Sequence, residues 1–201
     1  MALKVGITGG IGSGKSVVCD IFRLLGVPIF NSDLESREIL QSDALVRAGV
    51  KEIFGPQAYA MDGTPDRKFI ASLAFSDKSK LAKLNALIHP AVNKRFEDWC
   101  VEHSESDYVI KEAAILIESG AYKQLDCVVV VNAPEALRFK RASERDHLTT
   151  EEIIRRSKNQ LPESELNTYA DYKIQNDEAV LLIPQVMKLH SILKERAHKK
   201  S

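Results

Sequence analysis

The chain has 201 residues, a length that suits one domain with a substantial apolar core. Its 28 Lys and Arg residues balance 28 Asp and Glu residues, so nothing indicates the basic field that nucleic-acid binding needs. No apolar run approaches membrane-spanning length, and the first enters a glycine-rich loop at once. We therefore expect no signal peptide, no membrane partner and no nucleic-acid partner.

The three cysteines, Cys19, Cys100 and Cys127, are widely spaced among apolar neighbours. This odd number favours reduced, buried thiols over a disulfide framework or a metal site. Reduced thiols suit a cytoplasmic protein, which is the localisation that we predict. We expect a monomer or a weak homo-oligomer.

A phosphate-binding loop opens the chain. Residues 5–8 (Val-Gly-Ile-Thr) predict a strand that leads into Gly-Gly-Ile-Gly-Ser-Gly-Lys-Ser at 9–16, the G-x-x-x-x-G-K-S pattern of a P-loop. Such a loop wraps a triphosphate only if glycines remove side chains and allow positive φ, as we expect of Gly9, Gly10, Gly12 and Gly14. Lys15 then opens a helix facing the β and γ phosphates, and the hydroxyl of Ser16 can bind Mg²⁺. The alternative is a glycine-rich turn that binds no ligand.

A second strand is predicted at 27–30, after a helix over 17–25 that stops at Gly26. Asp33 follows this strand, and ligands gather at the carboxyl ends of strands in doubly wound sheets. Asp33 can therefore accept the proton of an attacking hydroxyl. The alternative is an N-cap for the next helix, and the two roles are compatible with each other.

Residues 34–103 have a charged, amphipathic helical texture without a convincing strand. This stretch is far longer than a simple crossover requires, so it predicts an inserted helical subdomain. Arg67 is expected to open a helix over 68–74. The pattern that ends at His89 and Pro90 is expected to close one helix before another begins.

The sheet is predicted to resume at 108–110 and at 127–131. The second run is apolar throughout, as in a strand covered on both faces. A last short strand is expected within 170–176, and a final helix carries an apolar side formed by Leu182, Val186, Leu189 and Leu193.

Two charged helices precede that last strand and are expected to form a lid over 138–161. The first begins at Pro134 and Glu135 and carries Arg138, Arg141 and Arg145 on one face. A capping box at 149–152 begins the second, which carries Arg155, Arg156 and Gln160. Closure can bring guanidinium groups to transferring phosphoryl oxygens. We favour a solvated position for Arg138 and a functional one for Arg145.

Three classes of P-loop protein compete for this sequence. A switch GTPase needs D-x-x-G and N-K-x-D elements, and a motor ATPase needs a strand that ends in Asp-Glu; the sequence has neither. Phosphoryl transfer asks mainly for positioning and charge neutralisation, which the loop and lid arginines can supply. A small-molecule kinase is therefore predicted, with a nucleotide-binding regulatory protein as the alternative from another class.

The chain resembles the dephospho-CoA kinase family nearly from end to end. The resemblance depends on Thr-Gly-Gly-Ile-Gly-Ser-Gly-Lys-Ser at 8–16, Asp33, the L-N-x-L-x-H-P element at 84–90, Leu116 and Glu118, Arg141, Arg145-Asp146, Arg156 with Gln160, and the A-D-x-x-I-x-N element at 170–176. The family phosphorylates the ribose 3′-hydroxyl of dephospho-CoA in the last step of CoA synthesis. A kinase of another nucleotide-like acceptor is the nearest alternative.

We therefore expect one α/β domain with the three-layer P-loop NTPase fold and about five parallel strands. Its nucleotide-binding core would comprise 1–33, 104–137 and 162–201, with a helical acceptor-binding insertion at 34–103 and a lid at 138–161.

The resemblance also implies the ligands and their residues. ATP is the expected donor, Mg²⁺ the expected metal and dephospho-CoA the expected substrate. Phosphate binding is assigned to the P-loop (Gly9, Gly10, Gly12, Ser13, Gly14, Lys15, Ser16 and Val17), with Arg141 and Asn176 also at the nucleotide and Asn176 near adenine. Asp33 is the implied base, with Lys15 and Arg145 also catalytic.

Arg67, His89 and Glu118 are implied to lie at or near the dephospho-CoA pocket, together with Asp33. For His89 the alternative is a histidine stabilised at a helix end, and for Glu118 it is a surface carboxylate.

Three positions depart from the usual pattern of the family. Asn31 stands where the first Asp of an Asp-x-Asp pair is common, which removes one carboxylate near the expected metal. Residues 112–115 (Glu-Ala-Ala-Ile) replace a segment that usually ends in Pro-Leu. Glu178 stands where Gly is usual.

Overall fold

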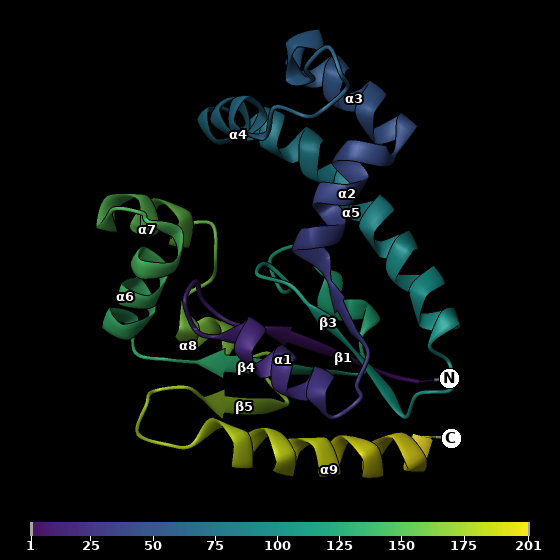
Figure 1. The fold of residues 1–201 in the computed structure, drawn as a ribbon, viewed down its shortest axis with the longest axis vertical. Coiled ribbons are helices and arrows are strands. Elements are labelled where there is room, and N and C mark those ends of the chain that lie inside the picture. The colour runs from purple at the N-terminus through teal and green to yellow at the C-terminus, as the bar shows by residue number, and fades with distance from the viewer. Residues whose placement is uncertain (1, 201) are drawn as a thin grey trace. The chain divides into compact units, whose positions relative to one another are not determined.

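A five-stranded parallel sheet forms the centre of the larger of two compact units in the computed structural model, which describes residues 2–200 (Figure 1). Its described residues are 2–31 and 99–200. The strands lie in the order β2-β3-β1-β4-β5, with bounds β1 Leu3–Thr8, β2 Ile29–Asn31, β3 Tyr108–Glu112, β4 Cys127–Asn132 and β5 Tyr172–Gln175. The predicted α/β fold with five parallel strands is confirmed.

Strand β1 occupies the middle of this sheet. Val5 pairs with Ile110 of β3 on one side and with Cys127 of β4 on the other. The chain leaves β1 for β2 at one edge and later places β4 on the opposite side, so the strand order reverses beside β1. In open α/β sheets ligands bind at such a reversal, outside the carboxyl ends of the strands. The residues that follow β1 therefore occupy the position of a ligand site.

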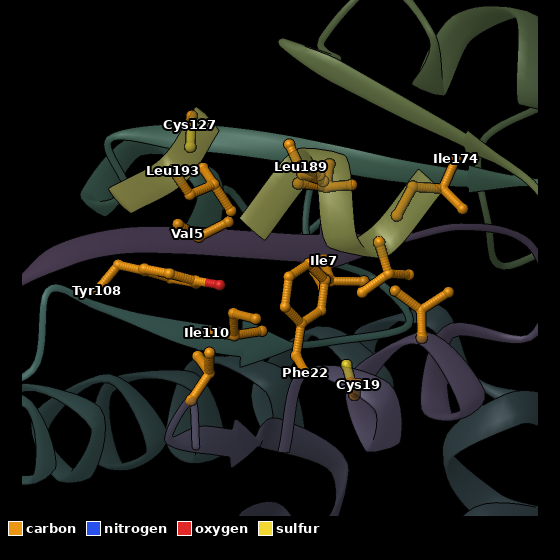
Figure 2. Close-up of a cluster of buried hydrophobic side chains, with 14 of the residues drawn as sticks. Val5, Ile7, Cys19, Phe22, Tyr108, Ile110, Cys127, Ile174, Leu189 and Leu193 are labelled. Carbon is orange, nitrogen blue, oxygen red and sulfur yellow. The ribbon is translucent and has the colours of Figure 1, made fainter. Parts of the chain in front are cut away.

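One face of the sheet is covered by α1 (Lys15–Leu24) and α9 (Leu182–Lys200). Figure 2 shows Phe22 of α1 and Leu189 and Leu193 of α9 converging on Val5 and Ile7 of β1. All five side chains are buried. Alternate residues of a strand point to opposite faces, so β1 supplies this core from every second position.

The opposite face packs against the segment that follows β3. Val128 and Val130 of β4 join Leu116 there. A Cβ atom on Gly6 would lie 2.6 Å from the side chain of Leu116, so Leu116 packs directly against the backbone of β1 at this point. The remaining short helices of the larger unit are η2 (Ala121–Gln124) and α8 (Glu163–Leu166). Both faces of β4 are thus buried, as its apolar sequence predicts.

Residues Ser32–Asp98 form the second unit, which is helical. Its elements are α2 (Ser32–Ser42), α3 (Ala44–Phe54), η1 (Pro56–Ala58), α4 (Arg67–Ser76) and most of α5 (Lys78–Glu102). The one β-bridge that the structure describes here pairs Tyr59 with Pro65. This unit begins two residues before the predicted insertion of 34–103 and ends at Asp98.

The predicted helix break near Pro90 is wrong, because α5 runs through it. Proline in a helix interior removes one backbone hydrogen bond and usually bends or ends the helix. Here, however, Leu84, Ile88, Val92 and Phe96 are all buried. They recur every four residues on both sides of Pro90, so one apolar stripe continues across it, and packing of that stripe outweighs the local preference.

The helices predicted as a lid are α6 (Glu135–Asp146) and α7 (Thr150–Ser157). The two sides of the predicted capping box are present, since Thr149 Oγ1 accepts from Glu152 N and Glu152 Oε2 accepts from Thr149 N. The prediction that Gln160 belongs to this second helix is wrong, because α7 ends at Ser157 and the chain then turns.

Across residues 2–200, none of the helices combines the length and the apolar character needed to cross a membrane. The three cysteines are buried and none forms a disulfide, as predicted.

Candidate active site

The P-loop joins β1 to α1 at the carboxyl edge of the sheet. Gly14 forms the N-cap of α1 with a φ of 92°, and Gly12 has a φ of 75°. A Cβ atom on Gly12 would lie 2.0 Å from the backbone oxygen of Arg138, and one on Gly14 would lie 2.1 Å from Asn176 Nδ2. These glycines are therefore needed for the backbone conformation and for the close approach of two other segments.

The ammonium group of Lys15 is folded over the loop. Its Nζ donates hydrogen bonds to the carbonyls of Gly9 at 2.7 Å and Gly10 at 3.2 Å. The positive charge thus lies at the helix N-terminus, beside the loop backbone. Both the charge and the amide groups at a helix N-terminus favour binding of an anion such as phosphate.

A buried carboxylate lies beside the P-loop serine. Glu112 ends β3 and is only 5% exposed. Its Oε1 accepts from Ser16 Oγ at 2.8 Å, and its Oε2 accepts from Asn31 Nδ2 at 2.8 Å. The carboxylate expected to be lost at Asn31 is thus replaced by one from the neighbouring strand.

Sequence reasoning treated Glu112 only as a departure from the family pattern. Its register opposite Ile7 of β1 and Asn31 of β2 places it at the ligand edge of the sheet. An acidic residue that ends a strand next to the P-loop strand was the signal that could have identified it.

These groups suit Mg²⁺, which is bound through few protein oxygens while it keeps several waters and substrate phosphates. Ser16 supplies a hydroxyl oxygen, and Glu112 supplies an anionic group in hydrogen-bond contact with it. Within 2–200 no group of three or more His, Cys, Asp or Glu side chains is arranged to hold a metal ion. The donor set therefore fits a metal shared with a nucleotide better than a metal held by protein alone.

Arg141 links α6 to the segment after β5. Its Nη1 donates to the carbonyl of Asn176 at 2.9 Å, and its Nη2 pairs with Glu178 Oε1 at 3.1 Å. The side chain of Asn176 in turn donates to the carbonyl of Ser13 at 2.8 Å. Two residues assigned to the nucleotide thus lie at the P-loop. Glu178 has a φ of 67°, which accounts for the glycine usual at this position.

Arg138 is packed against the loop, so the prediction of a solvated side chain is wrong. The side chain is 11% exposed, and its Nε donates to the carbonyl of Ala133 at 3.0 Å. A Cβ atom on Gly10 would lie 2.1 Å from the guanidinium group. Helical periodicity placed Arg138 on the arginine face of α6, but it did not reveal that this face meets the P-loop.

Arg145 ends the same face of α6 and pairs with its neighbour. Its Nε and Nη2 donate to the two carboxylate oxygens of Asp146, both at 2.8 Å, and Arg156 lies 3.8 Å from the same carboxylate. The hydrogen bonds from Arg145 lower the pKa of Asp146. The Arg145 side chain is 62% exposed, so it is held by Asp146 while it faces solvent.

Glu118 contacts the last residue of the predicted lid segment. Its Oε1 accepts from the backbone N–H of Leu161 at 2.7 Å. The residue is exposed, as the surface alternative requires, but it has this structural partner.

Asp33, Arg67 and His89 lie in the second unit. Asp33 is the second residue of α2, so it occupies the first helical turn and the N-cap alternative is wrong. Arg67 is exposed and opens α4, as predicted, behind an N-cap at Asp66. His89 lies in the interior of α5, so the helix-end alternative is wrong as well.

The chain is similar in sequence and in fold to known proteins. The family model described as dephospho-CoA kinase matches residues 3–181. A dephospho-CoA kinase from Bacteroides fragilis (strain YCH46) is 37% identical over 198 residues, which cover 98% of this chain and 96% of that protein. A crystal structure of a Thermus thermophilus protein superposes with a TM-score of 0.84 at 30% identity, covering 95% of this chain and 97% of that one.

A solved dephospho-CoA kinase from Campylobacter jejuni shares the fold, with a TM-score of 0.72 at 24% identity, and covers 97% of this chain and 98% of its own. The family match extends over the P-loop, the helical unit and the helices α6 and α7. The chain therefore belongs to the dephospho-CoA kinase family and is an ATP-dependent kinase.

Proposed function

We propose that the chain transfers the γ-phosphoryl group of ATP to the ribose 3′-hydroxyl of dephospho-CoA, giving CoA and ADP. The contact of Ser16 with buried Glu112, beside Lys15 at the end of the central strand, is the observation that carries the donor site. The acceptor is inferred from the family, whose relatives bear the name dephospho-CoA kinase.

The P-loop residues from Gly9 to Val17 bind the phosphates of ATP in this proposal. Lys15 exchanges the carbonyls of Gly9 and Gly10 for phosphoryl oxygens, where its charge and the loop amides stabilise the charge that develops during transfer. Ser16 and Glu112 hold Mg²⁺, directly or through water, and the ion, when bound, neutralises the phosphate charge.

Asp33 orients the 3′-hydroxyl and accepts its proton. As that O–H bond breaks, the hydroxyl oxygen forms a bond to the γ-phosphorus. The bond from this phosphorus to the bridging oxygen breaks, and its electron pair leaves with ADP. Arg67, His89 and Glu118 contribute to the pocket for dephospho-CoA.

The lid supplies the remaining groups. Arg145 turns from Asp146 toward the phosphoryl oxygens when the lid closes, and Arg141 and Asn176 contact the nucleotide. Closure excludes water, which would otherwise compete with the 3′-hydroxyl as acceptor. We also propose that the protein is cytoplasmic and a monomer or weak homo-oligomer that binds no nucleic acid.

Release of ADP from MgATP by the purified protein tests the proposal. We expect strong stimulation by dephospho-CoA, with CoA confirmed by its mass, and little stimulation by adenosine or AMP. Stimulation by another acceptor instead would keep the kinase and replace its substrate. Slow hydrolysis that no small acceptor changes would favour a nucleotide-binding regulatory protein.

A further inference from the structure

Gln160 contacts the P-loop from the end of the lid. The chain turns after α7, where Gln160 N donates to the carbonyl of Ser157 at 2.9 Å. The side chain of Gln160 then reaches the loop, and its Oε1 accepts from Ile11 N at 2.7 Å. Its Nε2 donates to the carbonyl of Ala114 at 2.7 Å and lies 3.4 Å from the carbonyl of Gly9. One amide thus joins the lid, the P-loop and the segment after β3.

These contacts supply hydrogen-bond partners that the loop backbone needs when the loop binds phosphate. Gly9 is buried, and the shorter of the two side-chain hydrogen bonds to its carbonyl comes from Lys15 Nζ. If Lys15 turns to a phosphoryl oxygen, as the proposed function requires, Gln160 Nε2 is the side-chain donor left beside this carbonyl. Gln160 Oε1 also holds the N–H of Ile11. A buried polar group without a partner destabilises the state that contains it, so Gln160 favours the loop conformation that receives phosphate.

The beginning of the lid meets the same loop. The backbone of Arg138 lies against Gly12, and its guanidinium group lies against Gly10. At the other end, the residue after Gln160 is held by Glu118 through the Leu161 N–H. Both ends of the lid segment are therefore fixed at the P-loop and its surroundings, while α7 lies between them.

We propose that Gln160 is a positioning residue that couples the lid to the P-loop and prepares the loop for the phosphates of ATP. It acts through Ile11 and Gly9 and does not touch the reacting atoms. The inference depends on the proposed function only in that the P-loop binds a nucleotide.

Gln160→Met removes both hydrogen-bonding groups and nearly preserves the shape of the side chain. We expect ADP binding, measured by calorimetry, to weaken about tenfold. The KM for ATP should rise by a similar factor, while the KM for dephospho-CoA changes little. Asn159→Ala, at the exposed neighbouring position, is the matched control and should bind ADP as the wild type does.

Gln160→Glu separates the two hydrogen bonds. A carboxylate can still accept from Ile11 N, but its second oxygen would face the carbonyl oxygen of Ala114. We expect weak ADP binding at pH 8 and recovery relative to the wild type as pH falls into the range where a carboxyl takes up a proton, about 4–5, because the neutral carboxyl can donate to Ala114 again. A merely structural role would not produce this recovery.

The proposal is overturned if both variants bind ADP within about twofold of the wild type, or if Gln160→Glu shows the same deficit at every pH. Should Gln160→Met fail to fold, the pH series on Gln160→Glu decides alone. Failure of the kinase proposal would be seen in a different experiment, because it would appear in the assay of ADP release by the wild-type protein with different acceptors.

Discussion

Ser16 donates a hydrogen bond to a carboxylate that lies 96 residues later in the chain, on Glu112. The parallel pairing of β1 and β3 brings the two together, because it sets Glu112 opposite Ile7. Asn31 holds the second oxygen of the same carboxylate from β2. Three segments thus place one negative charge next to the hydroxyl that is proposed to bind the metal.

Glu112→Gln should lower turnover by about 10- to 100-fold and raise the Mg²⁺ concentration needed for half-maximal rate. The reason is that the substitution removes the negative charge next to Ser16 but keeps the size of the side chain. Steady-state rates measured across a Mg²⁺ titration check this expectation. Glu105→Gln, at an exposed position before β3, serves as the control. An unchanged Mg²⁺ dependence would remove Glu112 from the proposed metal site.

Lys15→Ala should reduce turnover by roughly 100-fold or more, as expected when a preorganised donor of positive charge is removed. The fold should remain, because the two hydrogen bonds described for Lys15 Nζ both stay within its own loop. Turnover and thermal unfolding are measured together, with the exposed Lys188→Ala in α9 as control. Turnover close to normal would contradict the role proposed for the P-loop.

Asp33→Asn should lower kcat by roughly 100-fold or more while ADP affinity stays nearly unchanged. The amide keeps the shape of the carboxylate but cannot accept the proton of the 3′-hydroxyl. The test compares kcat with calorimetric ADP binding, and Glu38→Gln on the same helix is the control. If the variant turned over normally, the hydroxyl would have to lose its proton without Asp33.

His190 should make stability fall as the solution is acidified. Its Nδ1 lies 2.6 Å from Tyr108 Oη, and burial, with a smaller effect of Lys194, lowers its pKa below the ordinary 6.5, while Asp107 opposes the shift. As pH falls below about 6.5, His190 takes up a proton in the unfolded chain before it does so in the folded protein. Stability is therefore fully present above pH 6.5 and decreases as pH falls toward the lowered pKa.

Urea unfolding at pH 7.5, 6.5 and 5.5 measures this effect. His190→Gln cannot titrate, yet the side-chain amide of glutamine can donate to the Tyr108 hydroxyl or accept from it. The difference in unfolding free energy between the wild type and this variant should therefore shift in favour of the variant as pH falls. If this difference in unfolding free energy stayed constant with pH, the pKa of His190 would be the same in the folded and unfolded states.

The parts of the fold that could be predicted carry strong local signals. The spacing of the P-loop glycines, the apolar run of β4 and the Thr149–Glu152 capping box each lie within a few residues and need little from the rest of the chain. Backbone rules alone therefore specify them. The positive φ at Glu178 agrees with the glycine that is usual there in the family, but the sequence of this chain alone did not predict it.

Features that depend on distant partners could not be predicted in the same way. Gln160 contacts Ile11 across 149 residues of sequence, and no local pattern records that contact. Pro90 signals the end of a helix, yet the apolar stripe of α5 continues past it. Arg138 has the spacing of an exposed lid residue but meets the loop glycines. In each case tertiary packing decides, and it outweighs the local preference.

The burial of the three cysteines has a practical consequence for following the protein in solution. Burial raises the pKa of Cys127 to about 12 and that of Cys19 further still, from a reference value of 9.0, so few thiolates exist at these two positions in the folded protein at neutral pH. A thiol reagent should react mainly with molecules that have opened, and Cys19 lies in α1, directly behind the P-loop. The rate of alkylation at Cys19 then reports local opening without any added label. A bound nucleotide should lower this rate.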